Sequence, residues 1–134
     1  MVIDSSALIA VLCDEVEAPA IERAIAADGT RLVSAANLLE ASIVVEHRYG
    51  EAGGRELDLL MNTARISVAP VDGDQVEIAR DCWRRFGKGR HRARLNFGDC
   101  FAYALSRTSG EPLLFKGDDF VHTDLDLVSV EQTL

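Results

Sequence analysis

Five carboxylates occupy positions where apolar segments end or where helices are expected to begin. Asp4 follows the apolar start of the chain, and Asp118 and Asp119 follow the apolar run PLLF. Glu40 and Asp99 fall in the first turns of two expected helices, three residues after Asn37 and Asn96, which fit the N-caps of those helices. Any one of them has an ordinary explanation as a helix cap or a turn residue. Together on one edge they would repel each other unless a cation lay among them.

Several carboxylates on one edge suit a hard divalent cation. Oxygen ligands in this number favour Mg²⁺ or Mn²⁺. One or two such ions orient a water molecule, lower its pKa and stabilise charge on a phosphoryl group. The acids therefore predict hydrolysis of a phosphodiester, because the attacking and the leaving oxygen both carry charge in that reaction. The sequence leaves open whether one metal ion or two would bind.

The elements that must hold these acids alternate between short apolar runs and helical patterns. The runs MVI, RLVSA, ISVAPV, PLLF and LDLVSV predict strands. Helices are expected over 6–12, 18–27, 37–50, 55–64, 72–87 and 96–110. Such alternation predicts an α/β fold with right-handed crossovers, a central parallel sheet and helices on both faces. Ligands of these sheets bind beyond the carboxyl ends of the strands, which is where the acids are expected.

The length and composition indicate one globular domain over residues 1–134. The start MVIDSSALIA lacks a basic leader, and the apolar runs are far shorter than the roughly 20 residues that span a bilayer. We therefore expect a soluble, cytoplasmic protein. The cysteines at positions 13, 82 and 100 fit no zinc or redox spacing and are expected in the core, with a thiol nucleophile at Cys100 as the alternative.

The net charge of −8 conceals one concentrated basic stretch. Residues 84–94 hold six cations and no acid, which leaves 22 acids against eight bases elsewhere. This stretch either follows a nucleic-acid backbone or is simply a solvated loop. Trp83 and Phe86 beside it could stack on bases, although core packing is the favoured interpretation. The candidate RNA-binding residues are Arg84, Arg85, Lys88, Arg90, Arg92 and Arg94.

Three segments together resemble the PIN-domain ribonucleases of the VapC toxin type. They are VIDSSALIAVL, LVSAANLLEASIV and FGKGRHRARLNFGDCFAYALSRTSGEPLLFKGDDFVHTDL, and the resemblance extends over essentially the whole chain. It implies a three-layer α/β/α fold and Mg²⁺-dependent endoribonuclease activity, with Mn²⁺ as an alternative ion. It also implies a homodimer and a cognate VapB-type antitoxin, with promoter DNA bound only indirectly through that antitoxin. Transfer RNA and ribosomal RNA are the expected targets.

The resemblance also assigns roles to individual residues. It implies that Asp4 and Asp99 are the principal metal ligands and that Glu40 is the third acid of the site. The fourth acid is expected at Asp119, with Asp118 as the second choice. The resemblance gives Ser6 a supporting role, holding a water molecule or a phosphate.

Two other metal-dependent classes lack residues that they need here, and one binding class remains as the alternative. A receiver domain needs a pair of acids after the first strand, where VIDSS has one, and a phosphoacceptor after a later strand, which ISVAPV lacks. A phosphatase of the D-x-D type needs an aspartate where Ser6 stands. A non-catalytic RNA-binding module would use residues 84–94 alone. It would bind RNA without a metal and would not be weakened by the loss of one acid.

Overall fold

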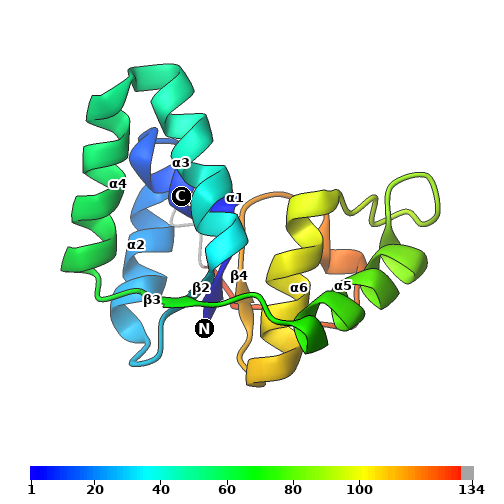
Figure 1. Cartoon of the computed structure of the whole chain (residues 1–134). Coiled ribbons are helices and arrows are strands. Elements are labelled where there is room, and N and C mark those ends of the chain that lie inside the picture. Colours follow the sequence, from blue (N-terminus) through cyan, green and yellow to red (C-terminus); the bar gives the residue numbers. More distant parts are fainter. Residues whose placement is uncertain (131–134) are drawn as a thin grey trace.

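The computed structural model describes residues 1–130, in which a four-stranded sheet lies between two groups of helices (Figure 1). The strands are β1 (Val2–Ile3), β2 (Leu32–Ser34), β3 (Ser67–Ala69) and β4 (Leu113–Leu114). Their order in the sheet is β3-β2-β1-β4, and every neighbouring pair is parallel. The carboxyl ends of all four strands therefore meet at one edge of the sheet.

The helices cover both faces of this sheet. One face carries the first four helices and the other carries the last two, as Figure 1 shows. The helices are α1 (Ser5–Leu12), α2 (Ala18–Ala27), α3 (Ala35–Tyr49), α4 (Glu51–Thr63), α5 (Gly73–Phe86) and α6 (Phe97–Ser109), and a short 3₁₀ helix, η1, spans Phe120–His122. No helix within residues 1–130 is both long and apolar enough to cross a membrane.

The two hydrophobic clusters follow from the alternation of side chains along the strands. Successive strand residues point to opposite faces of a sheet. Val2 and Leu113 pack with Tyr103 in the cluster beneath α5 and α6, whereas Ile3 and Leu114 belong to the cluster beneath α1 to α4. All five side chains are almost completely buried. The predicted three-layer α/β/α fold with a central parallel sheet is confirmed.

Helix α3 begins two residues earlier than the sequence predicted. Strand β2 ends at Ser34, and the helix starts directly at Ala35 without an intervening turn. The two alanines that follow Ser34 are strong helix formers and allow this start. Asn37 is therefore not the N-cap that the prediction made it, and Glu40 lies in the second turn of the helix, not in the first.

Helix α4 also begins earlier than predicted, at Glu51, and it contains two glycines that disfavour a helix. Gly53 is accommodated in this helix because it lies where α4 packs against α3. A Cβ atom at position 53 would be 2.9 Å from the backbone carbonyl carbon of Val45. The close approach of the two helices thus requires glycine, and the contact compensates for its low helix propensity.

The predicted last strand, over residues 125–130, is wrong. Leu127 forms one isolated parallel bridge with Leu113. The N–H of Leu113 donates to Asp126 at 3.0 Å and the N–H of Val128 donates to Leu113 at 2.9 Å. The segment thus pairs with β4 at a single bridge and does not form a continuous ladder.

Candidate active site at the strand ends

Asp4 lies at the carboxyl end of β1 and caps helix α1. Its Oδ2 accepts a hydrogen bond from the backbone N–H of Ser6 at 3.0 Å. The residue is only 3% exposed, and its other oxygen, Oδ1, is buried without a hydrogen-bond partner among residues 1–130. Burying a carboxylate oxygen without a hydrogen-bond partner costs free energy. A cation or a proton bound at this oxygen would remove that cost.

Glu40 extends from the second turn of α3 toward the same strand ends. Its Oε1 accepts a hydrogen bond from the hydroxyl of Ser5 and another from the amide of Asn37 at 3.4 Å. Ser5 is the first residue of α1 and lies next to Asp4. The hydroxyl of Ser5 thus connects the second acid to the element that holds the first.

Asp99 is fixed by a capping box at the start of α6. The backbone N–H of Asn96 donates to Asp99 Oδ2 at 2.9 Å, and the backbone N–H of Asp99 donates to Asn96 Oδ1 at 2.9 Å. This reciprocal pair satisfies two free N–H groups of the helix terminus. The sequence predicted this cap, and the cap leaves the Oδ1 atom of Asp99 available to the site.

The electrostatics of the buried acids show that they share one site. Burial, together with the charge of Glu40, raises the pKa of Asp4 to about 6, against the hydrogen bonds from Ser6. Burial also raises the pKa of Asp99 to about 7, with added repulsion from Asp4, Asp119 and Glu40. The structure therefore brings together four of the five carboxylates, which come from segments far apart in the sequence.

The two aspartates that follow β4 are both exposed. The charge of Asp119 is among the main causes that raise the pKa of Asp99. Asp119 as the fourth acid, with Asp118 as the second choice, stays a prediction.

The two serines after Asp4 have different contacts. The hydroxyl of Ser6 accepts a hydrogen bond from the backbone N–H of Lys116 at 3.0 Å, which ties the loop after β4 to α1. The hydroxyl of Ser5 contacts Glu40 instead. The sequence predicted a supporting role for Ser6. It did not predict the contacts that Ser5, Asn37 and Gly98 make with Glu40 or with each other. The pair of adjacent serines in VIDSS was the one available signal for Ser5, because nothing local indicates that Glu40 lies beside it.

The donor atoms of the site fit a hard divalent cation. The oxygens of Asp4 and Asp99 are anionic and buried, and one of them has no partner within residues 1–130. No group of three or more His, Cys, Asp or Glu side chains in those residues is placed as a complete metal-ligand set. An ion held by two carboxylates and several waters is typical of Mg²⁺, which gives up its hydration shell reluctantly.

The basic stretch divides into engaged and free cations. Arg85 forms ion pairs with Asp124 at 3.0 Å and Asp81 at 3.4 Å, and Arg90 lies over the ring of Trp83 at 4.1 Å. Residues 87–96 form a loop that leads directly into α6, the helix that holds Asp99 (Figure 1). Four cations of the stretch are exposed, and their side chains form no ion pair or hydrogen bond within the described part of the chain: Arg84, Lys88, Arg92 and Arg94.

The aromatic and sulfur side chains near this loop have separate roles. Phe86 is buried in the core, as expected, whereas Trp83 is 43% exposed. Cys82 and Cys100 are buried, and Cys13 is half-buried. The thiol of Cys100 donates to the carbonyl of Asn96 at 3.3 Å, not to a histidine, so its geometry does not support a thiol nucleophile.

Comparison with known proteins identifies the family of the chain. Residues 1–125 match the family described as PIN domain. The chain is 54% identical over 130 residues to Ribonuclease VapC30 of Mycobacterium tuberculosis, covering 97% of this chain and 99% of the relative. It is 56% identical over 128 residues to Ribonuclease VapC of Mycolicibacterium smegmatis, covering 96% and 99%.

A solved structure shows the same fold. The crystal structure of Mycobacterium tuberculosis VapC20, described as a Sarcin-Ricin loop cleaving toxin, superimposes with a TM-score of 0.77 at 20% identity. The alignment covers 95% of this chain and 97% of that one. The residues 1–125 that match the family include every one of the acids described above. The chain therefore belongs to the PIN domain family and, within it, to the VapC ribonucleases.

Proposed function

We propose that this chain is a Mg²⁺-dependent endoribonuclease, the toxin of a toxin–antitoxin module. The observation that supports it best is the buried, unpartnered Oδ1 of Asp4, in a site where Asp99, Glu40 and Asp119 repel one another. Such a site is unfavourable in an empty protein and favourable with a divalent cation. Its relatives named as VapC ribonucleases make RNA the substrate class to test.

The residues of the chain have distinct tasks in this proposal. Asp4 and Asp99 hold the ion, which supplies Lewis acidity for a water molecule and for the phosphoryl group. Glu40, held by Ser5, orients the attacking water, and Asp119 adds negative charge at the exposed side of the site. Ser6 keeps the loop that carries Asp119 next to α1 through its bond with Lys116. Mn²⁺ has the same ligand preferences and is the alternative ion.

The RNA is proposed to approach along the basic loop. Arg84, Lys88, Arg92 and Arg94 can contact phosphates without breaking an ion pair of the described structure. Transfer RNA and ribosomal RNA are the proposed targets, and the VapC20 structure is that of a toxin said to cleave the sarcin-ricin loop. Total cellular RNA is therefore the first substrate to use.

The deciding experiment is cleavage of total RNA by the purified protein with Mg²⁺, with EDTA, and with Asp99→Asn. Discrete cuts that disappear under both changes support the metal-dependent nuclease, and their positions identify the target. The competing function is the non-catalytic RNA-binding module. RNA binding that survives both changes, without cleavage of any RNA fraction, would favour that module.

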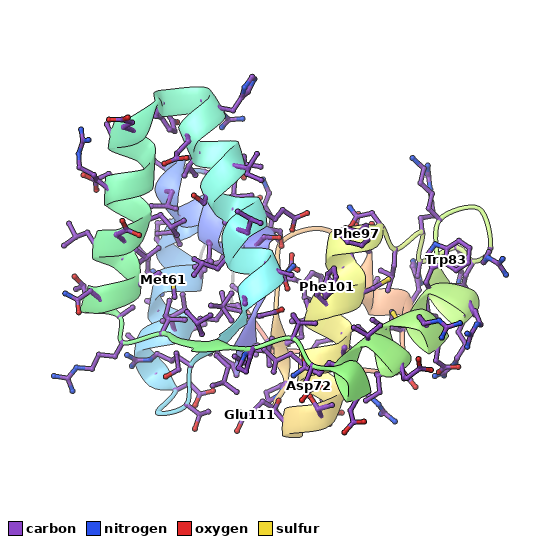
Figure 2. All side chains as sticks on the ribbon, viewed as in Figure 1. Met61, Asp72, Trp83, Phe97, Phe101 and Glu111 are labelled. Atoms are coloured by element: carbon purple, nitrogen blue, oxygen red, sulfur yellow. The ribbon has the colours of Figure 1, made fainter. Side chains whose placement is uncertain are left out.

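A homodimer is proposed from an exposed apolar face. Phe97 is 80% exposed at the start of α6, and Leu39 and Ile43 on α3 are 62% and 59% exposed. A hollow of about 490 Å³ between α5 and α6 is lined by Trp83, Phe97 and Phe101 among others, and Figure 2 shows Phe97 and Phe101 on α6 and Trp83 on α5. Uncovered apolar side chains in such a group are typical of an interface.

Light scattering after size exclusion tests the dimer. Phe97→Asp should give a monomer, whereas Val16→Asp, which changes a side chain 89% exposed between α1 and α2, should remain dimeric. A wild-type chain that is monomeric at high concentration would contradict the proposal.

The other proposed partner is a VapB-type antitoxin, through which promoter DNA is bound indirectly. The proposed location of the complex is the cytoplasm.

A further inference from the structure

We propose that Gly98 and Asn37 are positioning residues that hold the Glu40 carboxylate against the first turn of α6, beside Asp99. The proposal rests on the nuclease function proposed above and names residues that the acids depend on. Its evidence is that the Glu40 carboxylate is contacted from α1, from α6 and from a residue of its own helix, α3.

The first contact is between Glu40 and the backbone of Gly98. A Cβ atom at position 98 would overlap both carboxylate oxygens and lie 2.7 Å from Cδ of Glu40. Real Cβ atoms do not approach other heavy atoms within 3.0 Å. Gly98 does not have a positive φ, so its backbone conformation is open to any residue. The Glu40 carboxylate occupies the space that a side chain at position 98 would fill, so a larger residue there would displace this end of the flexible Glu40 side chain.

The second contact runs through Asn37, whose side chain is completely buried. Its amide nitrogen donates to the carbonyl of Gly98 at 2.9 Å and to Glu40 Oε1 at 3.4 Å. One side chain thus joins α3 to the backbone of α6 next to Asp99 and holds the acid one turn further along its own helix. The amide oxygen of Asn37 is buried without a partner among residues 1–130.

The third contact is the hydrogen bond from Ser5, which approaches the same carboxylate from α1. The acid is therefore held from α1, α3 and α6, each of which also carries or adjoins a carboxylate of the site. Movement of the Glu40 side chain away from Gly98 would take the acid away from Asp99. These three contacts thus fix the position of the third acid relative to the first two.

Paired substitutions separate positioning from a general effect on the fold. Gly98→Ala should displace the carboxylate and lower the single-turnover cleavage rate at saturating RNA at least tenfold, with RNA affinity in EDTA within twofold of wild type. Glu40→Asp shortens the acid by one methylene and restores space for the new methyl group. The double variant should therefore cleave faster than Gly98→Ala alone, although Glu40→Asp by itself is slower than wild type.

Two further variants serve as controls. Gly73→Ala adds a methyl group at the first residue of α5, where nothing lies within 4 Å, and should leave the rate and the urea midpoint unchanged. Asn37→Asp keeps the shape of the side chain and removes both N–H donors, so it should lower the rate at least tenfold. It keeps the proposal testable if Gly98→Ala does not fold.

The outcomes distinguish this inference from the function on which it rests. A wild-type protein that cleaves no RNA with Mg²⁺ contradicts the proposed function. The positioning of Glu40 is then tested by urea unfolding, where Gly98→Ala should lower the midpoint in the wild-type background and less in the Glu40→Asp background. Equal reductions of the urea midpoint in both backgrounds would overturn the inference. If the wild type is active, an Asn37→Asp or Gly98→Ala variant that cleaves within twofold of its rate would overturn it as well.

Discussion

Asp4 illustrates how one side chain in this protein serves the fold and the site together. One oxygen caps α1 through the N–H of Ser6, and the other faces the site without a partner in the described chain. Asp99 divides its oxygens in the same way, with Oδ2 in the capping box of α6. The helix starts thus hold both acids rigidly, and the free oxygens are left for a ligand. This arrangement makes the effect of single substitutions predictable.

Asp99→Asn should reduce RNA cleavage at least 100-fold while keeping the fold. The carboxamide oxygen can still accept the bond from Asn96, so the cap survives, but one anionic ligand is removed. The matched control is Asp74→Asn, which neutralises an acid in the first turn of α5. Initial cleavage rates and circular dichroism of the three proteins check this. Equal activity of Asp99→Asn and wild type would refute the assigned role.

Asp119→Asn should slow cleavage about tenfold more than Asp118→Asn. The two residues are adjacent and exposed, so the comparison is closely matched, and the charge of Asp119 is among the main causes that raise the pKa of Asp99. The rates of both variants under saturating Mg²⁺ test the difference. A larger effect at Asp118 would reassign the fourth acid.

At the scale of the elements, small shifts of boundary decide which residues meet. The early start of α3 turns Asn37 from an expected cap into a buried donor and moves Glu40 into the second turn. The basic stretch becomes the end of α5 and a loop that leads into α6. Within it, Arg85 is held by Asp124 and Asp81, so cations of one sequence run have different environments.

We therefore expect the cations of the basic stretch to fall into two classes by their effect on RNA binding. Alanine at Arg84, Lys88, Arg92 or Arg94 should weaken RNA binding and lower the slope of log affinity against log salt by about 0.7 for each phosphate that the variant no longer neutralises. Arg85→Ala should leave that slope nearly unchanged and lower thermal stability instead, because it removes the ion pair and the bond to Tyr103. Binding titrations at several salt concentrations, in EDTA, measure both effects. A uniform decrease of slope across all five variants would contradict this division.

At the scale of the whole molecule, the sheet concentrates negative charge at one edge. The strands are parallel, so the ends of β1 and β4 and the starts of α1 and α6 meet there. The hydrophobic layers on both sides exclude water from Asp4 and Asp99. The fold therefore keeps these acids protonated to a higher pH than free aspartate, and it loses stability when they ionise.

The pH dependence of stability follows from the pKa values of these acids. The folded chain holds the protons of Asp4 and Asp99 up to pKa values of about 6 and 7, against an ordinary value of 3.8. The resulting penalty is absent below pH 3.8, grows as the pH rises, and is complete above about 7. It is on the order of 3 kcal/mol for Asp4 and about 4 kcal/mol for Asp99, from the cost of about 1.4 kcal/mol per pKa unit.

In EDTA at pH 8, Asp99→Asn should therefore be more stable than wild type, and the difference should vanish toward pH 4. Mg²⁺ should stabilise wild type at pH 8 and not the variant, since it binds the ionised form. Urea unfolding at both pH values, with and without Mg²⁺, checks these expectations. A wild type that gains no stability from Mg²⁺ would count against the proposed metal site.

The sequence by itself determined the α/β class, the layered arrangement, the capping box of Asn96 and Asp99, and the acids worth testing. These features depend on local patterns, namely the alternation of elements, the helix caps and the position of acids after apolar runs. The tertiary structure decided the rest, because it depends on contacts between distant segments. Ser5 and Glu40 are 35 residues apart in the sequence, and Asn37 and Gly98 are 61 apart, so no local pattern predicts either hydrogen bond. The predicted last strand was wrong for the same reason, because strand pairing depends on a distant partner and Leu127 forms one isolated bridge with Leu113.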